Sequence, residues 1–323
     1  MGGKSQIIPR RFLFFLIAAA VIVLTFSYYG MGMMGGMSGG MMGHMKLMRG
    51  WIAGDTLPVD FKTPRPAPDK GAIASGKSIY TDRCAICHGP KGDGKGEKAK
   101  DLIVQPRDFT FAVYKFRSTP SGSAPTDEDI YKTVSRGLHQ TAMLPWIGLS
   151  ATEKWQVTYY IKSFSDFFDE GEELVTVKAP EKRESGAEYV KKGELVYKNA
   201  KCGVCHGPDG RGDGEKADKL KDDWQRPIKP TDFRRTILKR GLNIEEIYLT
   251  IATGLNGTPM PSFSTALSPD DMLSVSYYIR SLAPKLSRGG MMMMGMNGDE
   301  RTGMMTDMPG MRMGGGMMRN MMR

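Results

Sequence analysis

The sequence has no cysteine outside two short motifs. All four cysteines of the 323-residue chain lie in two C-x-x-C-H runs, at residues 84–88 and 202–206. None is left over for a disulfide framework. A zinc ribbon is also disfavoured, because it needs a second C-x-x-C within about 15 to 20 residues of the first. Here the two pairs are 118 residues apart.

Acidic residues are missing from the first 50 positions. That segment has a net charge of +5 and residues 288–323 carry a further +2, so only +3 of the total charge of +10 lies in the body of the chain. A basic groove for DNA or RNA needs its positive charge in a folded domain. The charge distribution therefore predicts no nucleic-acid partner.

One long uncharged apolar run occurs, from Phe12 to Tyr29, directly after Arg10 and Arg11. Its 18 residues are at the short end of what spans a bilayer. No small-x-small cleavage site follows it, which favours an uncleaved anchor over a signal peptide. Residues 1–30 are predicted to be a single-pass anchor in the inner (cytoplasmic) membrane, with the rest of the chain on the periplasmic side.

Methionine and glycine dominate both ends of the chain. We expect residues 31–70 to form a linker, rich in Met and Gly and then in Pro, and residues 289–323 to form a flexible Met-rich tail. Clustered thioethers, such as those from Met31 to Met48 with His44 among them, suit soft Cu(I). A copper-binding role and a plain flexible or partner-contacting tail both stay open.

Two copies of one pattern lie between these ends. Gly76 before the first motif matches Gly193 before the second, and the run Y-Y-I-K/R-S recurs near the end of each copy. A period near 118 residues is too long for a solenoid repeat and indicates a duplicated domain. The predicted domains are residues 71–170 and 186–288, joined by a linker at 171–185.

Helix signals fall at the same places in both copies, and nothing alternates convincingly as a strand. A helix is predicted before each motif, at 72–80 and 187–197. Four further helices are predicted to begin at an N-cap residue followed by an acid three positions later, and two of them to end at Gly137 and Gly254. The predicted fold is all-α. The four caps are Thr126 with Asp129, Ser150 with Glu153, Asn243 with Glu246 and Ser268 with Asp271.

The C-x-x-C-H motif places two thiols and an imidazole on one face of a helical turn. A flat macrocycle can then be held by two thioether bonds while the histidine binds its iron. A thioredoxin-like pair would need a strand before the motif, where the sequence predicts helix. The chain is therefore predicted to hold two covalently bound haem c groups, one through Cys84, Cys87 and His88 and the other through Cys202, Cys205 and His206.

Methionine usage predicts the second iron ligand of each haem. Of the 26 methionines, only Met143, Met260 and Met272 lie between the two ends. Met143 follows its motif histidine by 55 residues and Met260 follows its own by 54. These two are the predicted ligands, whereas Met272 lies inside a predicted helix, where a packing role is expected.

The first copy departs from the second at two positions near its methionine. His139 is a rival ligand, although Asn256 is its counterpart in the second copy. Leu144 stands between Met143 and the following proline, while in the second copy proline follows Met260 directly. The loop geometry is therefore less secure in the first domain.

At these residues the chain resembles the class I, or mitochondrial-type, c-type cytochromes, with the two-domain arrangement of dihaem cytochromes such as the c4 type and of haem subunits of respiratory complexes. The resemblance covers about residues 72–166 and 186–284. It implies His88 and Met143 on one iron, and His206 and Met260 on the other. It also implies aromatic packing between helices by Tyr80, Tyr159, Tyr197 and Tyr277, and we consider Arg107 and Arg117 as candidates for contacts with haem propionates.

A six-coordinate His/Met iron has no open position for a substrate, which suits outer-sphere electron transfer. The sequence predicts a membrane-anchored electron-transfer protein rather than an enzyme. It would carry single electrons between a donor and an acceptor protein of a respiratory chain, with subunits of a larger complex as further partners. The alternative is a dihaem peroxidase, which would need one iron with a displaceable ligand.

Overall fold

The computed structural model describes residues 42–168, 174–181, 186–234 and 237–283. The predicted membrane anchor and the Met-rich C-terminal tail lie outside these residues. The chain divides into two compact units, Met1–Gly50 and Trp51–Arg323. In the first unit, residues 42–50 are helical rather than irregular, in keeping with the helix propensity of Met, Leu, Lys and Arg. Among the described residues, no helix combines the length and apolar character needed to cross a bilayer.

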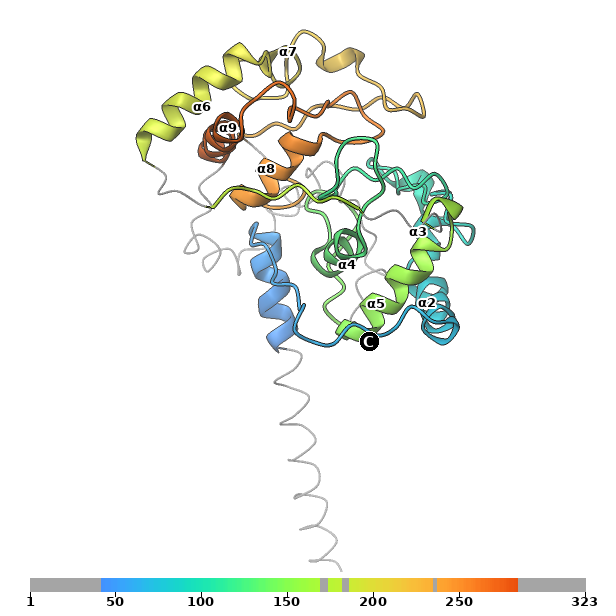
Figure 1. The fold of residues 1–323 in the computed structure, drawn as a ribbon. Coiled ribbons are helices and arrows are strands. Elements are labelled where there is room, and N and C mark those ends of the chain that lie inside the picture. Colours follow the sequence, from blue (N-terminus) through green and yellow to red (C-terminus); the bar gives the residue numbers. More distant parts are fainter. Residues whose placement is uncertain (1–41, 169–173, 182–185, 235–236, 284–323) are drawn as a thin grey trace, which may run out of the picture. The chain divides into compact units, whose positions relative to one another are not determined.

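The second unit is all-α over its described residues and repeats one arrangement of helices (Figure 1). β-pairing there is limited to an isolated bridge between Lys221 and Pro227. The first copy contains α2 (Lys70–Arg83), α3 (Ala85–His88), the 3-10 turn η1 (Ala99–Asp101), α4 (Asp127–Arg136), α5 (Ala151–Lys162) and the turn η2 (Asp166–Phe168). The second contains α6 (Ala187–Asn199), α7 (Gly203–His206), the turn η3 (Ala217–Lys219), α8 (Ile244–Thr253) and α9 (Pro269–Leu282).

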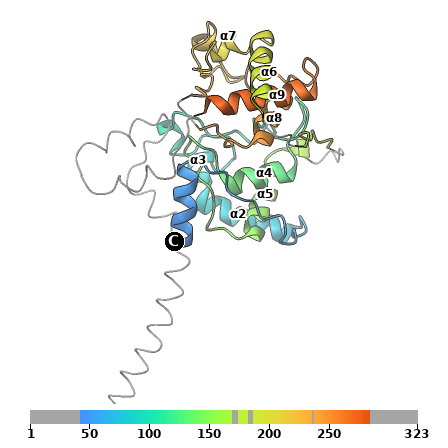
Figure 2. The ribbon, with the colours of Figure 1, turned by 90° about the vertical axis from the view of Figure 1, so that its left-hand side faces the viewer.

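The helix before each motif crosses the last helix of its domain at a glycine. Helix α2 packs on α5, and α6 packs on α9 (Figures 1 and 2). A Cβ atom on Gly76 would lie 2.0 Å from the carbonyl oxygen of Gln156, and one on Gly193 would lie 2.1 Å from that of Ser274. These helices therefore approach so closely that only glycine fits at the crossing, which explains the matched glycines of the sequence.

Three of the four predicted N-caps form with their expected acids. Thr126 and Ser150 make reciprocal capping boxes, with Asp129 and Glu153 respectively. Ser268 accepts a hydrogen bond from the backbone N–H of Asp271. Helices α4 and α8 end at Gly137 and Gly254, as predicted, with φ angles of 64° and 67°.

The fourth cap differs from the prediction. Asn243 caps α8 by accepting a hydrogen bond from the backbone N–H of Glu245. Glu246, which was expected to complete the cap, is only 2% exposed and forms ion pairs with Arg136 and Arg240. Three arginine and lysine side chains surround this carboxylate. Because leaving a buried carboxylate unpaired is costly, Glu246 pairs with these cations instead of bonding back to the N-cap backbone.

The tyrosines that recur in both copies lie in the cores between helices. Tyr80 and Tyr197 are each 1% exposed, and Tyr159 and Tyr277 are 4% and 5% exposed. Met272 is 3% exposed and packs in the core of the second domain. The predicted packing roles of these residues are therefore confirmed.

Residues 51–69, within the range predicted as a linker, form a strap that packs along the first domain. Trp51 and Leu57 are buried, at 2% and 6% exposure. The strap is also hydrogen-bonded, because its carbonyl groups accept from side chains of the helices beneath. The carbonyl oxygens of Leu57, Asp60 and Pro66 accept from Arg136, Tyr131 and Tyr159 respectively, over 2.8, 2.7 and 2.7 Å.

Candidate haem-binding sites

Each C-x-x-C-H run forms a short helical turn directly after the first helix of its domain. The backbone N–H of His88 donates to the carbonyl of Cys84, and that of His206 donates to the carbonyl of Cys202, both over 2.9 Å. These i to i+4 bonds close one helical turn, so both cysteines and the histidine lie toward the same side.

The two histidines are oriented in the same way. Nδ1 of His88 lies 3.3 Å from the carbonyl oxygen of Arg107, and Nδ1 of His206 lies 3.3 Å from that of Thr231. Backbone carbonyls commonly fix metal-binding imidazoles like this, leaving Nε2 for the metal. Burial lowers the pKa of His88 to about 4 and also lowers the pKa of His206, which favours the neutral imidazole that binds metals.

Aromatic residues hold each histidine and the backbone beside it in place. Phe109 stacks on His88 with ring centroids 4.6 Å apart and an interplanar angle of 19°, and Phe233 stacks on His206 at 4.6 Å and 20°. The buried hydroxyl of Tyr80 donates to the carbonyl of the glycine after His88 over 2.8 Å. Tyr197 makes the same contact in the second copy over 2.7 Å, so the two settings are equivalent.

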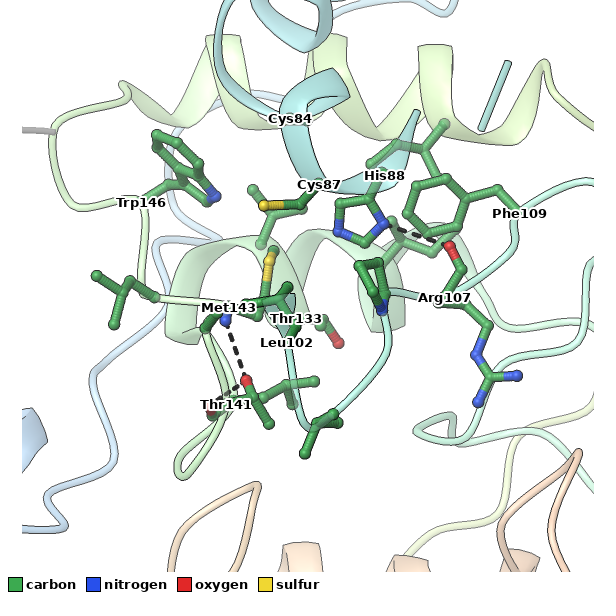
Figure 3. A pocket seen from close by; sticks show the side chains of 18 of the residues that line it. Cys84, Cys87, His88, Leu102, Arg107, Phe109, Thr133, Thr141, Met143 and Trp146 are labelled. Atoms are coloured by element: carbon green, nitrogen blue, oxygen red, sulfur yellow. Dashed lines mark hydrogen bonds between the residues drawn. The ribbon is translucent and has the colours of Figure 1, made fainter. Parts of the chain in front are cut away.

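Each motif lines an apolar cavity. The volumes are about 560 Å³ in the first domain and about 510 Å³ in the second, within the range of cofactor pockets. In the first cavity the Met143 side chain extends toward the side that holds Cys87 and His88 (Figure 3). All eight predicted site residues line these cavities, namely Cys84, Cys87, His88 and Met143 in the first and Cys202, Cys205, His206 and Met260 in the second.

Burial disfavours the thiolate form of three of the cavity cysteines. Burial raises the pKa of Cys84 to about 12 and that of Cys202 to about 11, and it also raises the pKa of Cys87. Thiol redox pairs of the thioredoxin type depend on a lowered thiol pKa. The environment of the motifs therefore disfavours that interpretation.

The methionines lie on two equivalent segments, residues 137–146 and 254–263, which we call the methionine loops. The N–H of Leu138 donates to the carbonyl of Met143 over 2.8 Å, and the N–H of Leu255 donates to the carbonyl of Met260 over 3.1 Å. Each loop is thus closed on itself at its methionine.

Sequence reasoning missed a threonine in each methionine loop. The N–H of Met143 donates to Oγ1 of Thr141 over 3.0 Å (Figure 3), and that of Met260 donates to Oγ1 of Thr258 over 3.3 Å. The shared T-x-M spacing is visible in the sequence and was the signal that could have found them.

Leu144 does not lengthen the first loop. The N–H of Trp146 donates to the carbonyl of Val134, and the N–H of Phe263 donates to that of Ile251. The two donors are 117 residues apart, and so are the two acceptors. Met143 and Met260 are separated by the same number of residues. Leu144 therefore occupies the place that proline has in the second copy, and the two loops keep one register.

His139, the rival ligand, lies away from the first cavity lining. Its ring stacks on Trp51 with centroids 4.6 Å apart and an interplanar angle of 17°. It is 5% exposed, and burial lowers its pKa to about 4. Its contacts are those of a core residue under the strap.

Polar groups at the cavity margins suit the carboxylates of a haem. Lys115 and Lys239 line both cavities, and Arg107 lines the first, where it lies over the Trp224 ring at 4.8 Å. Burial lowers the pKa of Lys115 to about 8 and also lowers the pKa of Lys239 and Arg107. The buried hydroxyl of Tyr114, in the first cavity, has no hydrogen-bond partner among the described residues. A propionate would satisfy both the cations and this hydroxyl, so the residues present fit the group.

Arg117, the other candidate for a propionate contact, has a different role. It is 0% exposed and lines neither cavity. Its guanidinium donates to backbone carbonyls, including that of Thr253 at 2.7 Å. The sequence could not distinguish the two arginines, because the fold alone decides which one reaches a cavity.

Comparisons with known families match both domains. The model of the family Cytochrome c matches residues 190–283, and the model of the family Cytochrome C oxidase, cbb3-type, subunit III matches residues 71–161. Among solved structures, a chain of the Kuenenia stuttgartiensis reducing HAO-like protein complex Kustc0457/Kustc0458 is 41% identical, with a TM-score of 0.63. That similarity covers 65% of this chain and 96% of the other.

Curated relatives include two proteins named Cbb3-type cytochrome c oxidase subunit CcoP. The one from Azospirillum sp. (strain B510) is 26% identical over 230 residues, covering 65% of this chain and 62% of the relative. The one from Azospirillum brasilense is 28% identical over 154 residues, covering 44% of this chain and 41% of the relative. The matches thus span less than two thirds of either relative.

Proposed function

Because the chain belongs to the class I c-type cytochromes and has two cytochrome c domains, we propose that it transfers single electrons through two covalently bound haem c groups. Each haem supplies an iron that changes its charge by one without binding a substrate. The observation that carries the proposal is the equivalence of the two cavities, each of which is lined by two cysteines, a histidine and a methionine.

The residues of each cavity have separate tasks. The cysteine thiols would attach the macrocycle, and the histidine Nε2 and the methionine sulfur would bind its iron. A neutral thioether favours the ferrous state over a second imidazole, and the apolar lining penalises the extra ferric charge. Both haems are therefore proposed to have raised reduction potentials.

Cations complete the sites by binding the propionates. Lys115 and Lys239 lie where the two cavities share lining residues, so they can serve a propionate of either haem. Arg107 and Tyr114 add donors in the first cavity. Charge-assisted hydrogen bonds of this kind are about twice as strong as neutral ones.

The cofactor content provides the first test. Full-length protein should contain two haems per chain in a pyridine haemochrome assay, with a mass that exceeds the polypeptide by two haem groups. Met143→Ala and Met260→Ala should each lower the potential of one haem, whereas Met272→Leu, a core change outside both cavities, should leave both potentials unchanged. A bare-polypeptide mass would refute the proposal, and turnover of hydrogen peroxide would favour the peroxidase alternative.

We further propose that residues 12–29 anchor the protein in the inner membrane, with the domains on the periplasmic side, where redox proteins act as donor and acceptor. The names of the relatives, a cbb3-type oxidase subunit and a member of an HAO-like complex, support a role as a subunit of an oxidoreductase complex. Membrane fractionation tests the anchor. Deletion of residues 1–30 should release the protein from the membrane, and full-length protein in the soluble fraction would contradict it.

A further inference from the structure

Arg117 of the first domain holds the end of α8 in the second domain. Its side chain is fully buried, and its Nη2 donates to the carbonyl of Thr253 over 2.7 Å while Nη1 donates to that of Gly254 over 3.4 Å. The last carbonyls of a helix have no partner within the helix, so the guanidinium acts as its C-terminal cap. Gly254 is the first residue of the loop that carries Met260, so this contact fixes where that loop begins.

A second contact fastens the same loop from the first domain. Asn256 lies four residues before Met260. Its Oδ1 accepts from the N–H of Gly122 over 3.2 Å, and its Nδ2 donates to the carbonyl of Ser123 over 3.4 Å. The loop is therefore held at two points by residues outside its own domain.

The second domain holds the other methionine loop in return. The N–H of His139 donates to the carbonyl of Lys239 over 2.9 Å, and the side-chain amide of Gln140 donates to the carbonyl of Ile237. Gln140 has a φ of 59°, a left-handed conformation that a residue with a Cβ adopts only when its surroundings impose it. These bonds hold the turn that leads into Met143.

A buried ion-pair cluster fixes the two helices that run into these loops. The carboxylate of Glu246, on α8, lies 2.8 Å from Nη1 of Arg136 and 2.5 Å from Nη2 of Arg240. Arg136 is the last residue of α4, directly before the first methionine loop. Removing one partner from a buried pair is strongly destabilising, so α4 and α8 are held in a fixed relation.

We propose that each domain positions the iron-binding methionine of the other, so that both haems keep sulfur ligation only while the two domains are docked. The inference rests on the proposed His/Met ligation. A neutral thioether ligand depends on the loop that presents it, and the residues around a metal ligand commonly decide its orientation. Arg117, Asn256 and Gln140 line neither cavity, and they act as positioning residues.

The test uses full-length, haem-loaded protein and three variants, Arg117→Gln, Asn256→Ala and Gln140→Ala. NMR of the ferrous protein follows the upfield methyl signal of each axial methionine, and Met143→Ala and Met260→Ala assign the two signals. Imidazole titration of the ferric protein measures how readily each methionine is displaced.

The variants should act on one haem each. Arg117→Gln and Asn256→Ala should weaken the Met260 signal and raise the imidazole affinity of the second haem, by about tenfold for the loss of a charge-assisted hydrogen bond at Arg117. Gln140→Ala should do the same at Met143 alone. Arg65→Ala, which removes an arginine whose partners Asp127, Glu128 and Tyr159 all lie in the first domain, should change neither signal.

Two failures can be told apart. Wild-type protein without either methionine signal would overturn the proposed ligation itself. Two wild-type signals that persist in all three variants, with unchanged imidazole affinities, would overturn only the positioning across domains. Should Arg117→Gln fail to retain two haems per chain, Asn256→Ala and Gln140→Ala decide the question, because they remove smaller contacts.

Discussion

Thr141 and Thr258 determine how each methionine backbone is presented to its cavity. Each hydroxyl accepts from the methionine N–H and also donates to the carbonyl of the leucine after the helix-ending glycine, over 2.8 Å in both domains. One side chain thus satisfies two backbone groups within a tight loop. Valine has the same shape but can make neither bond.

We therefore expect Thr141→Val and Thr258→Val each to lower the free energy of unfolding by about 1 to 3 kcal/mol, because a partly buried N–H loses its partner. Each should also lower the potential of the haem in its own domain. Urea unfolding and potentiometric titration measure the two effects. Thr81→Val, which removes a hydroxyl bonded only within α2, is the control, and equal losses in all three variants would contradict the role of the loop threonines.

His139 should make the stability depend on pH. Burial lowers its pKa in the folded state to about 4, from an ordinary value of 6.5, so the unfolded chain binds a proton more readily. Stability is therefore complete above about pH 6.5 and falls as the pH decreases toward 4, by at most about 3 kcal/mol. His139→Asn introduces the residue found at this place in the second domain.

The measurement compares urea unfolding of both proteins between pH 7 and pH 5. The variant should lose less stability than wild type over this interval, since its remaining titratable groups are the same. Parallel curves for the two proteins would show that the imidazole takes up its proton in the fold as readily as in the unfolded chain.

At the scale of single residues, the sequence predicted residues that line the cavities but not the residues that hold the cavity loops in place. The motif cysteines, the histidines and the paired methionines each carry a distinctive chemistry at a recurring spacing. Arg117 has neither, because the two carbonyls that it bonds in the second domain lie 136 and 137 residues further along the chain. No local pattern records such a contact.

The helix crossings at Gly76 and Gly193 set the distance between α2 and α5, and between α6 and α9. We expect Gly76→Ala and Gly193→Ala each to destabilise the protein by about 3 kcal/mol, the upper part of the usual range for overpacking, because the new Cβ would meet a rigid backbone carbonyl. Thermal unfolding at matched haem content measures the loss.

Gly148→Ala serves as the matched change, since a Cβ there would have no atom within 4 Å. Its effect should stay within about 0.5 kcal/mol, as for other surface substitutions. Similar losses at all three glycines would contradict the close helix approach as their cause, because the loss of unfolded-chain entropy on Gly→Ala is stabilising.

Helix positions and ends were predictable because caps and terminal glycines act over three or four residues. The exception is Glu246, which has the position of a capping acid but pairs with Arg136 from the other domain. A pattern read along one helix cannot foresee a cation that arrives from a segment 110 residues away. Tertiary pairing prevailed over the local rule.

The two cavities share part of their lining through Lys115 and Lys239. A cation beside both cavities would favour the ferrous state of a haem bound in each, so Lys115→Gln and Lys239→Gln should lower both proposed haem potentials. A unit charge at about 10 Å in an effective dielectric of about 20 corresponds to a shift on the order of 70 mV. Lys154→Gln, on α5 and lining neither cavity, is the control, and a shift confined to one haem would refute the shared role.

The duplication itself was legible in the sequence, yet the contacts between the copies were not. Matched residues reveal what both domains have in common, such as the stacked phenylalanines and the hydroxyl contacts of Tyr80 and Tyr197. The interface uses residues that differ between the copies, including Asn256 where the first has His139. The residues that match between the copies therefore do not include those that join the two domains.

Under the proposed membrane anchoring, the strap would also limit how far the haem domains can move to meet a partner. If residues 51–69 were loose, these 19 residues could add a leash of about 65 Å when fully extended. Bonded to Arg136, Tyr131 and Tyr159, they add almost no slack. The distance that the haem sites could reach from an attachment point upstream therefore depends on the chain before Trp51. Releasing the strap would increase that distance without lengthening the chain.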